Sequence, residues 1–315
     1  MKEPLVSICM PTYNYGRYIG EAIESVLQQD FDNYELIIVD DGSVDDTDEI
    51  VARFTSRNRN IRYYKNAENI GMVNNWNLCL DKSSGRYIKY LFADDKFADN
   101  TALRVMCDAL EKNSSAIMVC SARIVIDEKS VPKKVWSFLD SDTLADGWKL
   151  SKQCIMEQRN IIGEPTAVMF RRTEGMIGFD PLFRQLVDLE MWLRLLRHGD
   201  MVFLRRPLVS FRQHPEQQSE VNSKTMVAIH EMDRISRSYF AAATRKCNLF
   251  TRCYVCYTYL YKVWKASLNG CISKSESESI VTEKKYHYLI YLIMPIYKII
   301  NPIAKYIIKL NRGNL

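Results

Sequence analysis

Short apolar runs alternate with amphipathic segments along the first half of the chain. The runs are rich in β-prone residues, and the segments between them place their apolar residues on one helical face. The expected strands are Leu5–Met10, Tyr34–Val39, Ile61–Lys65, Tyr87–Phe92 and Ala116–Ile126, the last being one strand or a strand pair. The expected helices are Tyr18–Gln28, a helix from about Asp46, Met72–Asp81 and Asn100–Lys112. This order predicts an α/β fold with a Rossmann-like, mainly parallel central sheet flanked by helices.

The second half of the chain is less regular. The stretch 127–146 is polar, and we expect it to be rich in loops. Further on, the pattern predicts a helix over Trp148–Gln158 and another over Leu189–Arg197, with strands at Thr166–Phe170 and Met201–Phe211. Beyond about Val221 the chain becomes helical, aromatic and then basic. We therefore expect a domain over residues 1–220 and a helical C-terminal region over 221–315.

Two adjacent carboxylates, Asp94 and Asp95, follow the run Tyr87–Phe92 directly. A buried strand does not tolerate unpaired charge at its end, so the pair needs a partner. Carboxylate oxygens are the ligands that hard divalent cations prefer, and ligands of open α/β sheets bind at the carboxyl ends of strands. The pattern therefore predicts a metal-assisted site here, with a solvated acid pair as the simpler alternative.

The net charge of +5 lies at the end of the chain. From residue 281 on there are six basic residues against one acidic residue, so residues 1–280 are neutral. A neutral body argues against nucleic-acid binding, which requires a basic face. The nine cysteines are scattered, which predicts reduced thiols in the cytoplasm, and Cys253 and Cys256 are expected to pack within a helix.

Four polar segments fall at the ends of expected strands, namely Pro11–Asn14, Val39–Ser43, Asn69–Gly71 and Phe92–Asp95. In their order and spacing they resemble family 2 glycosyltransferases. Val6–Asn14, Asn69–Asn77 and Ser84–Ile88 resemble signatures of the same family, and the likeness covers roughly residues 4–215. The resemblance implies an inverting enzyme with the GT-A fold, of the bacterial cell-surface polysaccharide type. It implies a nucleotide-binding half at about 1–115 and an acceptor half at about 116–220.

The resemblance also implies which residues contact the nucleotide-sugar donor. They are Pro11, Thr12, Tyr13, Asn14, Asp40, Asp41, Asn69, Gly71, Asn77 and Asp94. Without the resemblance, several of these are ordinary turn residues, and Asn69 and Gly71 fit a plain glycine turn equally well. The acids that follow, Asp45, Asp46 and Asp48, are expected to cap the next helix, where Asp46 and Glu49 match a capping box.

For the metal, the resemblance implies Mn²⁺ or Mg²⁺ across the donor diphosphate, where it offsets the charge of the leaving group. Asp95 is the better metal ligand, and Asp94 is a second ligand or a ribose contact. Phe92 stands where the family usually carries a further Asp. His214, in a segment that resembles the family's Arg-x-His, is either a metal or diphosphate contact or a structural histidine.

Inverting transfer needs a general base for the acceptor hydroxyl. The segment Val187–Leu195 resembles the family's Glu-Asp motif at the head of a helix, with Val187 in place of the Glu. This implies that Asp188 is the base. Glu190 is the rival base or an acceptor contact, and both acids also suit a helix start without any catalytic role.

The tail Tyr286–Ile308 is rich in Leu, Ile and Tyr but is interrupted by lysines and prolines. Its uncharged run is shorter than the roughly 20 residues that span a bilayer. We expect it to lie on anionic lipid, or else to pack on the domain or on a partner.

Together these features predict a cytoplasmic enzyme, peripheral on the cytoplasmic face of the membrane. It would move a single sugar from a UDP- or dTDP-linked donor to a hydroxyl of a glycan or lipid-linked glycan. One alternative is a sugar-nucleotidyltransferase, although Pro11–Arg17 lacks the Gly-rich basic loop that such an enzyme needs. The other is a non-catalytic scaffold of the same fold.

Overall fold

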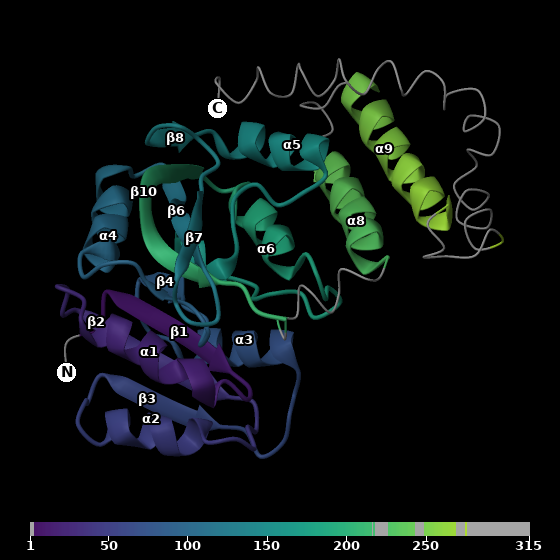
Figure 1. Cartoon of the computed structure of the whole chain (residues 1–315). Helices are drawn as coiled ribbons and strands as arrows, with labels where there is room; N and C mark the ends of the chain where they lie inside the picture. The colour runs from purple at the N-terminus through teal and green to yellow at the C-terminus, as the bar shows by residue number, and fades with distance from the viewer. Residues whose placement is uncertain (1–2, 216, 218–225, 243–248, 269–274, 276–315) are drawn as a thin grey trace. The chain divides into compact units, whose positions relative to one another are not determined.

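The computed structural model describes residues 3–215, 217, 226–242, 249–268 and 275 (Figure 1). The chain divides into two compact units. The first takes residues 1–148, 162–182 and 187–214, and the second takes 149–161, 183–186 and the residues from 215 on. A domain boundary at residue 220 stays a prediction.

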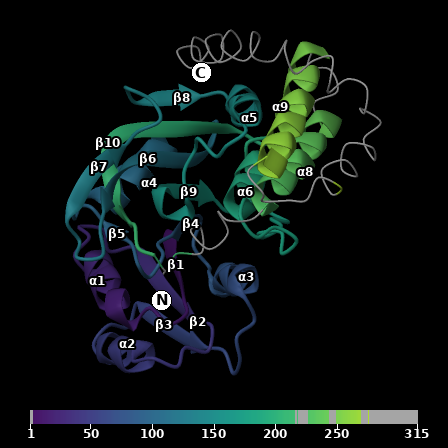
Figure 2. The same cartoon turned by 45° about the vertical axis from the view of Figure 1, so that its right-hand side comes forward.

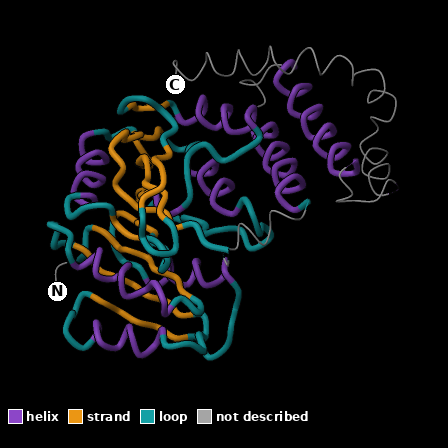
Figure 3. The backbone as a smooth tube through the Cα atoms, viewed as in Figure 1, coloured by secondary structure: helices purple, strands orange, loops and turns teal. Residues whose placement is uncertain are grey.

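Ten strands of the described chain form one sheet in the first unit, drawn in orange in Figure 3. Its first part has the order β3-β2-β1-β4, and all of these strands are parallel. They are β1 (Val6–Thr12), β2 (Tyr34–Asp40), β3 (Ile61–Lys65) and β4 (Tyr87–Tyr90). Because the chain moves outward from β1 to one side and then returns to its other side at β4, the carboxyl end of β1 is a topological switch point. Open α/β sheets bind ligands there.

The rest of the sheet mixes directions. Strand β9 (Val168–Arg171) is antiparallel to both β4 and β6 (Ala116–Ile126), and β10 (Asp200–Arg212) is parallel to β6. The short strands β5 (Lys96–Phe97), β7 (Pro132–Trp136) and β8 (Thr143–Ala145) are antiparallel to their neighbours. The stretch 127–146, expected to be rich in loops, therefore contains two strands. β7 was not predicted because its exposed lysines, which suit an edge strand, interrupt the alternation of apolar and polar residues that indicates a strand.

Helices cover the sheet of the first unit, which confirms the predicted α/β class. They are α1 (Gly16–Leu27), α2 (Thr47–Thr55), α3 (Met72–Lys82), α4 (Ala102–Lys112) and α6 (Val187–Leu195). Helix α1 buries the stripe that its sequence predicts, from Tyr18 and Ile19 to Ile23 and Val26. Figure 2 shows α1 and α3 on opposite sides of β1 and β2.

The described part of the second unit is helical. It contains most of α5 (Gly147–Glu157), together with α8 (Val227–Ala242) and α9 (Leu249–Leu268), and the last two lie side by side (Figures 1 and 2). Glu231 on α8 accepts hydrogen bonds from the backbone N–H groups of residues 184, 185 and 186, at 2.5, 3.0 and 2.7 Å. In the stretches that the structure describes, each helix is too short or too polar to cross a bilayer. The predicted membrane tail, Tyr286–Ile308, lies outside the described residues.

Among the residues that the structure describes, five cysteines are free and buried. They are Cys9, Cys79, Cys107 and Cys120 in the first unit and Cys154 in the second. Burial raises the pKa of each thiol, to about 12 for Cys107, Cys120 and Cys154. Cys256 is half-buried on α9.

Candidate active site

The loops after β1 and β2 are fastened to each other. The Asn14 N–H donates to Ser43 Oγ at 2.8 Å, and the Val44 N–H donates to Asn14 Oδ1 at 2.9 Å. Asn14 adopts the left-handed conformation, with φ 56°, which an asparagine tolerates well. Thr12 ends β1 with a buried hydroxyl that has no hydrogen-bond partner in the described chain, and Tyr13 is 44% exposed. The structure thus keeps the predicted residues of the first loop together at the switch point.

Asp40 and Asp41 are fully buried and hydrogen-bonded by neutral donors. Asp40 accepts from the Ser43 N–H at 2.8 Å and from the Tyr63 hydroxyl at 2.7 Å. Asp41 accepts from the Asn66 side chain and from the N–H groups of Ile70 and Gly71, at 2.9, 2.8 and 3.0 Å. The Asp41 carboxylate therefore shapes the Asn69–Gly71 loop. Gly71 has φ 89° there, a backbone conformation that favours glycine even though a Cβ atom would meet no neighbour.

The predicted capping box of α2 is wrong. The side chain of Asp46 makes no cap hydrogen bond. Asp45 instead accepts from the N–H and hydroxyl of Thr47, at 3.2 and 2.5 Å, and from the Gly16 N–H at 2.8 Å. Asp45 thus bonds the start of α2, and its carboxylate bonds the start of α1 as well.

Asp94 and Asp95 lie in the turn between β4 and β5, where they meet residues from the far end of the first unit. Asp95 accepts from the Thr166 hydroxyl at 2.5 Å and from the Arg212 N–H at 2.7 Å. Asp94 Oδ2 lies 3.1 Å from His214 Nε2. Burial raises the pKa of Asp95 well above its usual range and the charge of Asp94 adds to this, whereas the bonds from Thr166 and Arg212 act in the opposite direction.

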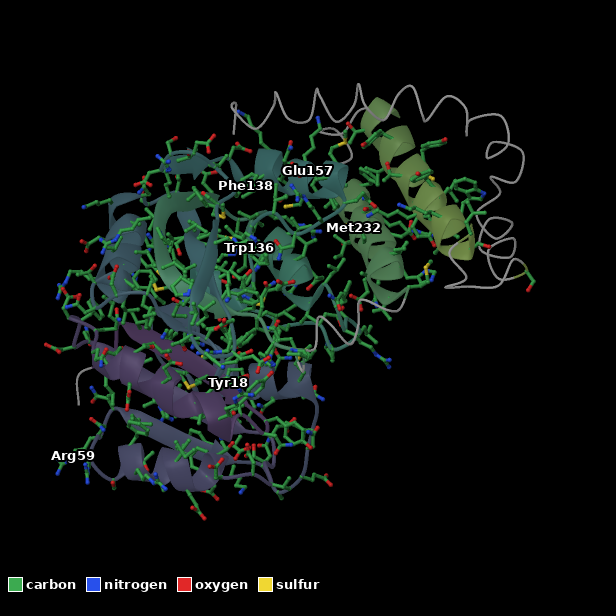
Figure 4. All side chains as sticks on the ribbon, in the orientation of Figure 1. Tyr18, Arg59, Trp136, Phe138, Glu157 and Met232 are labelled. Atoms are coloured by element: carbon green, nitrogen blue, oxygen red, sulfur yellow. The ribbon has the colours of Figure 1, made fainter. Side chains whose placement is uncertain are left out.

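Arg212 joins several segments around this pair, a role that the sequence did not reveal. Its guanidinium donates to the Asp94 carbonyl and to Glu21 Oε2, both at 2.6 Å, and to Ser130 Oγ at 2.9 Å. It also lies over the ring of Tyr18, a residue of α1 labelled in Figure 4, at 4.6 Å from the ring centroid. The Arg-x-His segment was the available signal, but the reach of the arginine depends on the tertiary fold.

His214 is enclosed by aromatic rings. Its ring centroid lies 5.8 Å from that of Tyr15 and 5.3 Å from that of Tyr18. Nδ1 is buried and has no hydrogen-bond partner among the described residues. Nε2 faces Asp94, and Nδ1 is the second ring nitrogen that could bind a ligand.

A second cation, Lys89, lies in the centre of the sheet beneath the acid pair. It is fully buried on β4, paired with Ile8 of β1 and Met169 of β9. Its ammonium donates to the carbonyl of Thr166, the residue whose hydroxyl binds Asp95. Burial lowers the pKa of Lys89 to about 7, against the attraction of Asp95. A charge inside an apolar run was visible in the sequence, but its partner was not.

Phe92, at the position of the missing acid, packs on α3. Its ring centroid lies 4.8 Å from that of Trp76. Trp76 also contacts Phe179, whose ring meets Tyr90 of β4 and Trp192 of α6, at centroid distances of 5.1, 5.3 and 6.1 Å. This aromatic cluster therefore joins α3, β4 and α6 below the site.

Asn77 on α3 faces the backbone of Phe179. Its Nδ2 donates to the Phe179 carbonyl at 2.8 Å, and its Oδ1 accepts from the Phe179 N–H at 2.7 Å. A contact between Asn77 and the nucleotide stays a prediction.

Asp188 and Glu190 lie in the first turn of α6. Asp188 is half-buried, and its Oδ1 accepts from the Leu189 N–H at 2.7 Å. Glu190 is paired with Arg194 at 2.8 Å, four residues on. One oxygen of Glu190 is thus engaged by a cation.

The residues present fit a divalent cation that takes most of its ligands from elsewhere. Within the described ranges, no three His, Cys, Asp or Glu side chains gather closely enough to hold an ion by themselves. Asp94 and Asp95 offer hard oxygen atoms, and His214 offers a buried imidazole. Mg²⁺ is commonly held by one or two carboxylates, with substrate phosphates and water completing its shell.

Comparison with known proteins places this geometry in context. The model of the family "Glycosyl transferase family 2" matches residues 7–174. Over 220 residues the chain is 32% identical to an uncharacterized protein of Mycobacterium tuberculosis, covering 67% of this chain and 68% of the relative. Over 197 residues it is 30% identical to the putative teichuronic acid biosynthesis glycosyltransferase TuaG of Bacillus subtilis, covering 62% and 74%.

Two solved structures share the fold. The crystal structure of residues 1–349 of S. aureus TarS with UDP-GlcNAc has a TM-score of 0.58 at 16% identity, covering 81% of this chain and 80% of that one. The mannosyltransferase PcManGT from Pyrobaculum calidifontis, in complex with GDP-Man and Mn²⁺, has a TM-score of 0.53 at 14% identity, covering 93% and 87%. At these identities the likeness shows the fold alone, which is the expected GT-A type.

Proposed function

Since the chain belongs to glycosyl transferase family 2, we propose that it transfers one sugar from a nucleotide-diphosphate sugar to an acceptor hydroxyl, with inversion at the anomeric carbon. The observation that carries this proposal is the grouping of polar loops at the carboxyl ends of β1, β2 and β4. There the fastened loops after β1 and β2 adjoin the turn that bears Asp94 and Asp95. Family membership sets aside the nucleotidyltransferase alternative, and the scaffold alternative is left to experiment.

The donor would lie across the carboxyl ends of β1, β2 and β4. Thr12, with its unpartnered buried hydroxyl, supports a polar contact from the first loop to the nucleoside. The loops that Asp40 and Asp41 shape would form the walls of that pocket. A UDP- or dTDP-linked sugar is our proposed donor, and TarS, which shares the fold, was solved with UDP-GlcNAc.

Asp94 and Asp95 would hold Mn²⁺ or Mg²⁺ against the donor diphosphate, with His214, which lies against Asp94, as a contact to the metal or to the diphosphate. When bound, the cation would offset the negative charge that develops on the departing nucleotide diphosphate. Thr166 and the Arg212 backbone fix both oxygens of Asp95, so that its carboxylate is oriented before the donor arrives. The guanidinium of Arg212 fixes the backbone of the same turn through the Asp94 carbonyl.

Asp188 would take the proton of the acceptor hydroxyl as its oxygen bonds to the anomeric carbon. The bond from that carbon to the diphosphate oxygen breaks at the same time, and the nucleotide diphosphate leaves. We assign this role to Asp188 because its segment resembles the family's motif, and Glu190 shares an ion pair with Arg194. A partly exposed acid in the first turn of a helix is also accessible to an acceptor.

We propose a glycan or lipid-linked glycan as the acceptor, in polysaccharide biosynthesis at the cytoplasmic face of the membrane. The printed name of the relative TuaG, which concerns teichuronic acid biosynthesis, supports this class. The basic, apolar tail over 286–308 would keep the enzyme at the membrane surface.

The replacement Asp188→Asn tests the proposal. We expect transfer to fall by roughly 10²–10⁴-fold, the usual contribution of a general base, while donor affinity is retained. Release of nucleotide diphosphate from UDP- and dTDP-sugars and calorimetric donor binding would measure the two effects. Asp108→Asn, which changes an exposed acid on α4, is the matched control and keeps full activity. Near-normal turnover of Asp188→Asn would refute the assignment, and a wild-type protein that releases no nucleotide diphosphate would favour the scaffold.

A further inference from the structure

The segment Ile177–Phe179, which lies between β9 and α6, is held from two directions within the first unit. From α3, Asn77 makes the paired hydrogen bonds to the Phe179 N–H and carbonyl, at 2.7 and 2.8 Å. From α6, Arg194 donates to the carbonyls of Ile177 and Gly178, at 2.8 and 2.6 Å. Four hydrogen bonds from two helices thus converge on three consecutive residues.

Glu190 fixes the second of these two side chains. Its Oε1 accepts from Arg194 Nε at 2.8 Å, while the other guanidinium nitrogens reach the carbonyls. A planar guanidinium suits such multiple bonding, because its donors have a fixed fork geometry. Glu190 is therefore part of the support of the segment.

The fit between Asn77 and the segment leaves no spare space. A Cβ atom at Gly178 would lie 2.3 Å from Asn77 Oδ1, which is far inside van der Waals contact. On either side of Phe179 the apolar side chains of Ile177 and Leu182 are 74% and 67% exposed, so they anchor little. Phe179 itself is buried in the aromatic cluster. The segment therefore depends on Phe179 and on the hydrogen bonds of Asn77 and Arg194.

We propose that Asn77 is a positioning residue for sugar transfer, which, together with Arg194, fixes Ile177–Phe179 and thereby sets α6 and its Asp188 relative to α3. Asn77 is adjacent to Trp76 and follows the Asn69–Gly71 loop, so it links the donor side of the site to the helix of the base. The proposal rests on the proposed function for the role of Asp188. It differs from the expectation that Asn77 contacts the nucleotide.

The test is Asn77→Ala in the full-length protein, with two measurements. Calorimetry with UDP and Mn²⁺ gives nucleotide affinity, and hydrogen exchange read by mass spectrometry gives the opening of residues 187–195. We expect the Kd for UDP to stay within about twofold and exchange over 187–195 to rise about tenfold or more. Transfer should fall about 10–100-fold in kcat with an unchanged KM for the donor.

Further variants keep the test sharp if Asn77→Ala folds poorly. Gly178→Ala pushes on the same contact without removing a polar atom and should give the same pattern. Arg194→Lys keeps the charge beside Glu190 but cannot span both carbonyls, so exchange over 187–195 should rise again. Gly20→Ala, where a Cβ has room, is the control and should match wild type.

A tenfold loss of UDP affinity with unchanged exchange over 187–195 would overturn the proposal, because Asn77 would then be a nucleotide contact. Unchanged exchange and transfer in both Asn77→Ala and Gly178→Ala would overturn it as well. Failure of the proposed function is distinguishable, since the wild-type protein would then release no nucleotide diphosphate, whereas the exchange comparison does not depend on turnover.

Discussion

Two pairs of adjacent aspartates stand at the carboxyl ends of parallel strands, and their surroundings are opposite. Asp40 and Asp41 after β2 are bonded by neutral donors within 30 residues along the chain. Asp94 and Asp95 after β4 meet Thr166, Arg212 and His214, which are between 71 and 120 residues away. The first pair folds its own loops, whereas the second draws distant segments together around a concentration of charge.

The difference shows how a buried acid can serve structure or be held ready for a ligand. The bonds to Asp40 and Asp41 come mostly from backbone N–H groups of turns that these acids create. At Asp95, burial and the charge of Asp94 together disfavour the ionised form, as the raised pKa shows. A site with such strained electrostatics is a candidate for function rather than for stability.

Replacing Asp95 by Asn should have the largest effect on activity. Several kcal/mol of metal-assisted charge stabilisation correspond to a loss of about a thousandfold in transfer. The melting temperature of the metal-free protein should equal or exceed that of wild type, because the change removes a disfavoured charge. Calorimetry and a nucleotide-release assay with Mn²⁺ measure both. Retained turnover, or a large drop in melting temperature, would contradict the contrast between the pairs.

Replacing Asp41 by Ala should show the opposite balance. The change leaves the Asn66 side chain and the N–H groups of Ile70 and Gly71 without their acceptor, which should lower the free energy of unfolding by about 3 kcal/mol. Urea denaturation measures this. Asp48→Ala removes a half-exposed acid paired with Lys65, and this control should cost at most about 0.5 kcal/mol. Equal stabilities of the two variants would remove the structural role of Asp41.

Lys89, which lies beside the second pair, should make the free energy of unfolding depend on pH. The ammonium titrates at about 7 in the folded protein and near pH 10.4 in the unfolded chain, so between these values the unfolded chain binds more protons. The free energy of unfolding of wild type relative to Lys89→Met should therefore rise with pH, by about 1.5 kcal/mol between about pH 7 and pH 8.5. Urea titrations at both pH values measure the difference. A constant or falling difference would mean that the folded protein does not lower the pKa of Lys89.

The sequence predicted features that depend on local pattern. The parallel strands and the Asp94–Asp95 turn follow from apolar runs that end in charge. Two strands in the stretch 127–146 were missed, β7 because exposed lysines leave it little apolar pattern and β8 because it has only 3 residues. The capping box of Asp46 and Glu49 is not formed, and the start of α2 is instead bonded by Asp45, one of the three acids expected there, which also binds Gly16, 29 residues earlier.

The parts of the site that depend on distant partners could not be predicted. Arg212 and Lys89 were visible as residues, but their contacts with Glu21 and Thr166 lie 191 and 77 positions away. The bond between Asn77 and Phe179 spans 102 positions. No periodicity encodes such pairings, because they arise only when the sheet order brings the segments together.

The buried thiols are natural probes of the rate at which each unit opens. A thiol reacts as the thiolate, and the raised pKa values leave almost none of that form in the folded protein. Cys120 lies in the first unit and Cys154 in the second, so alkylation at each site, located by peptide mapping, would time the two openings separately. The wild-type protein therefore carries the reporters needed to learn whether the helical part loosens before the sheet does, without any introduced label.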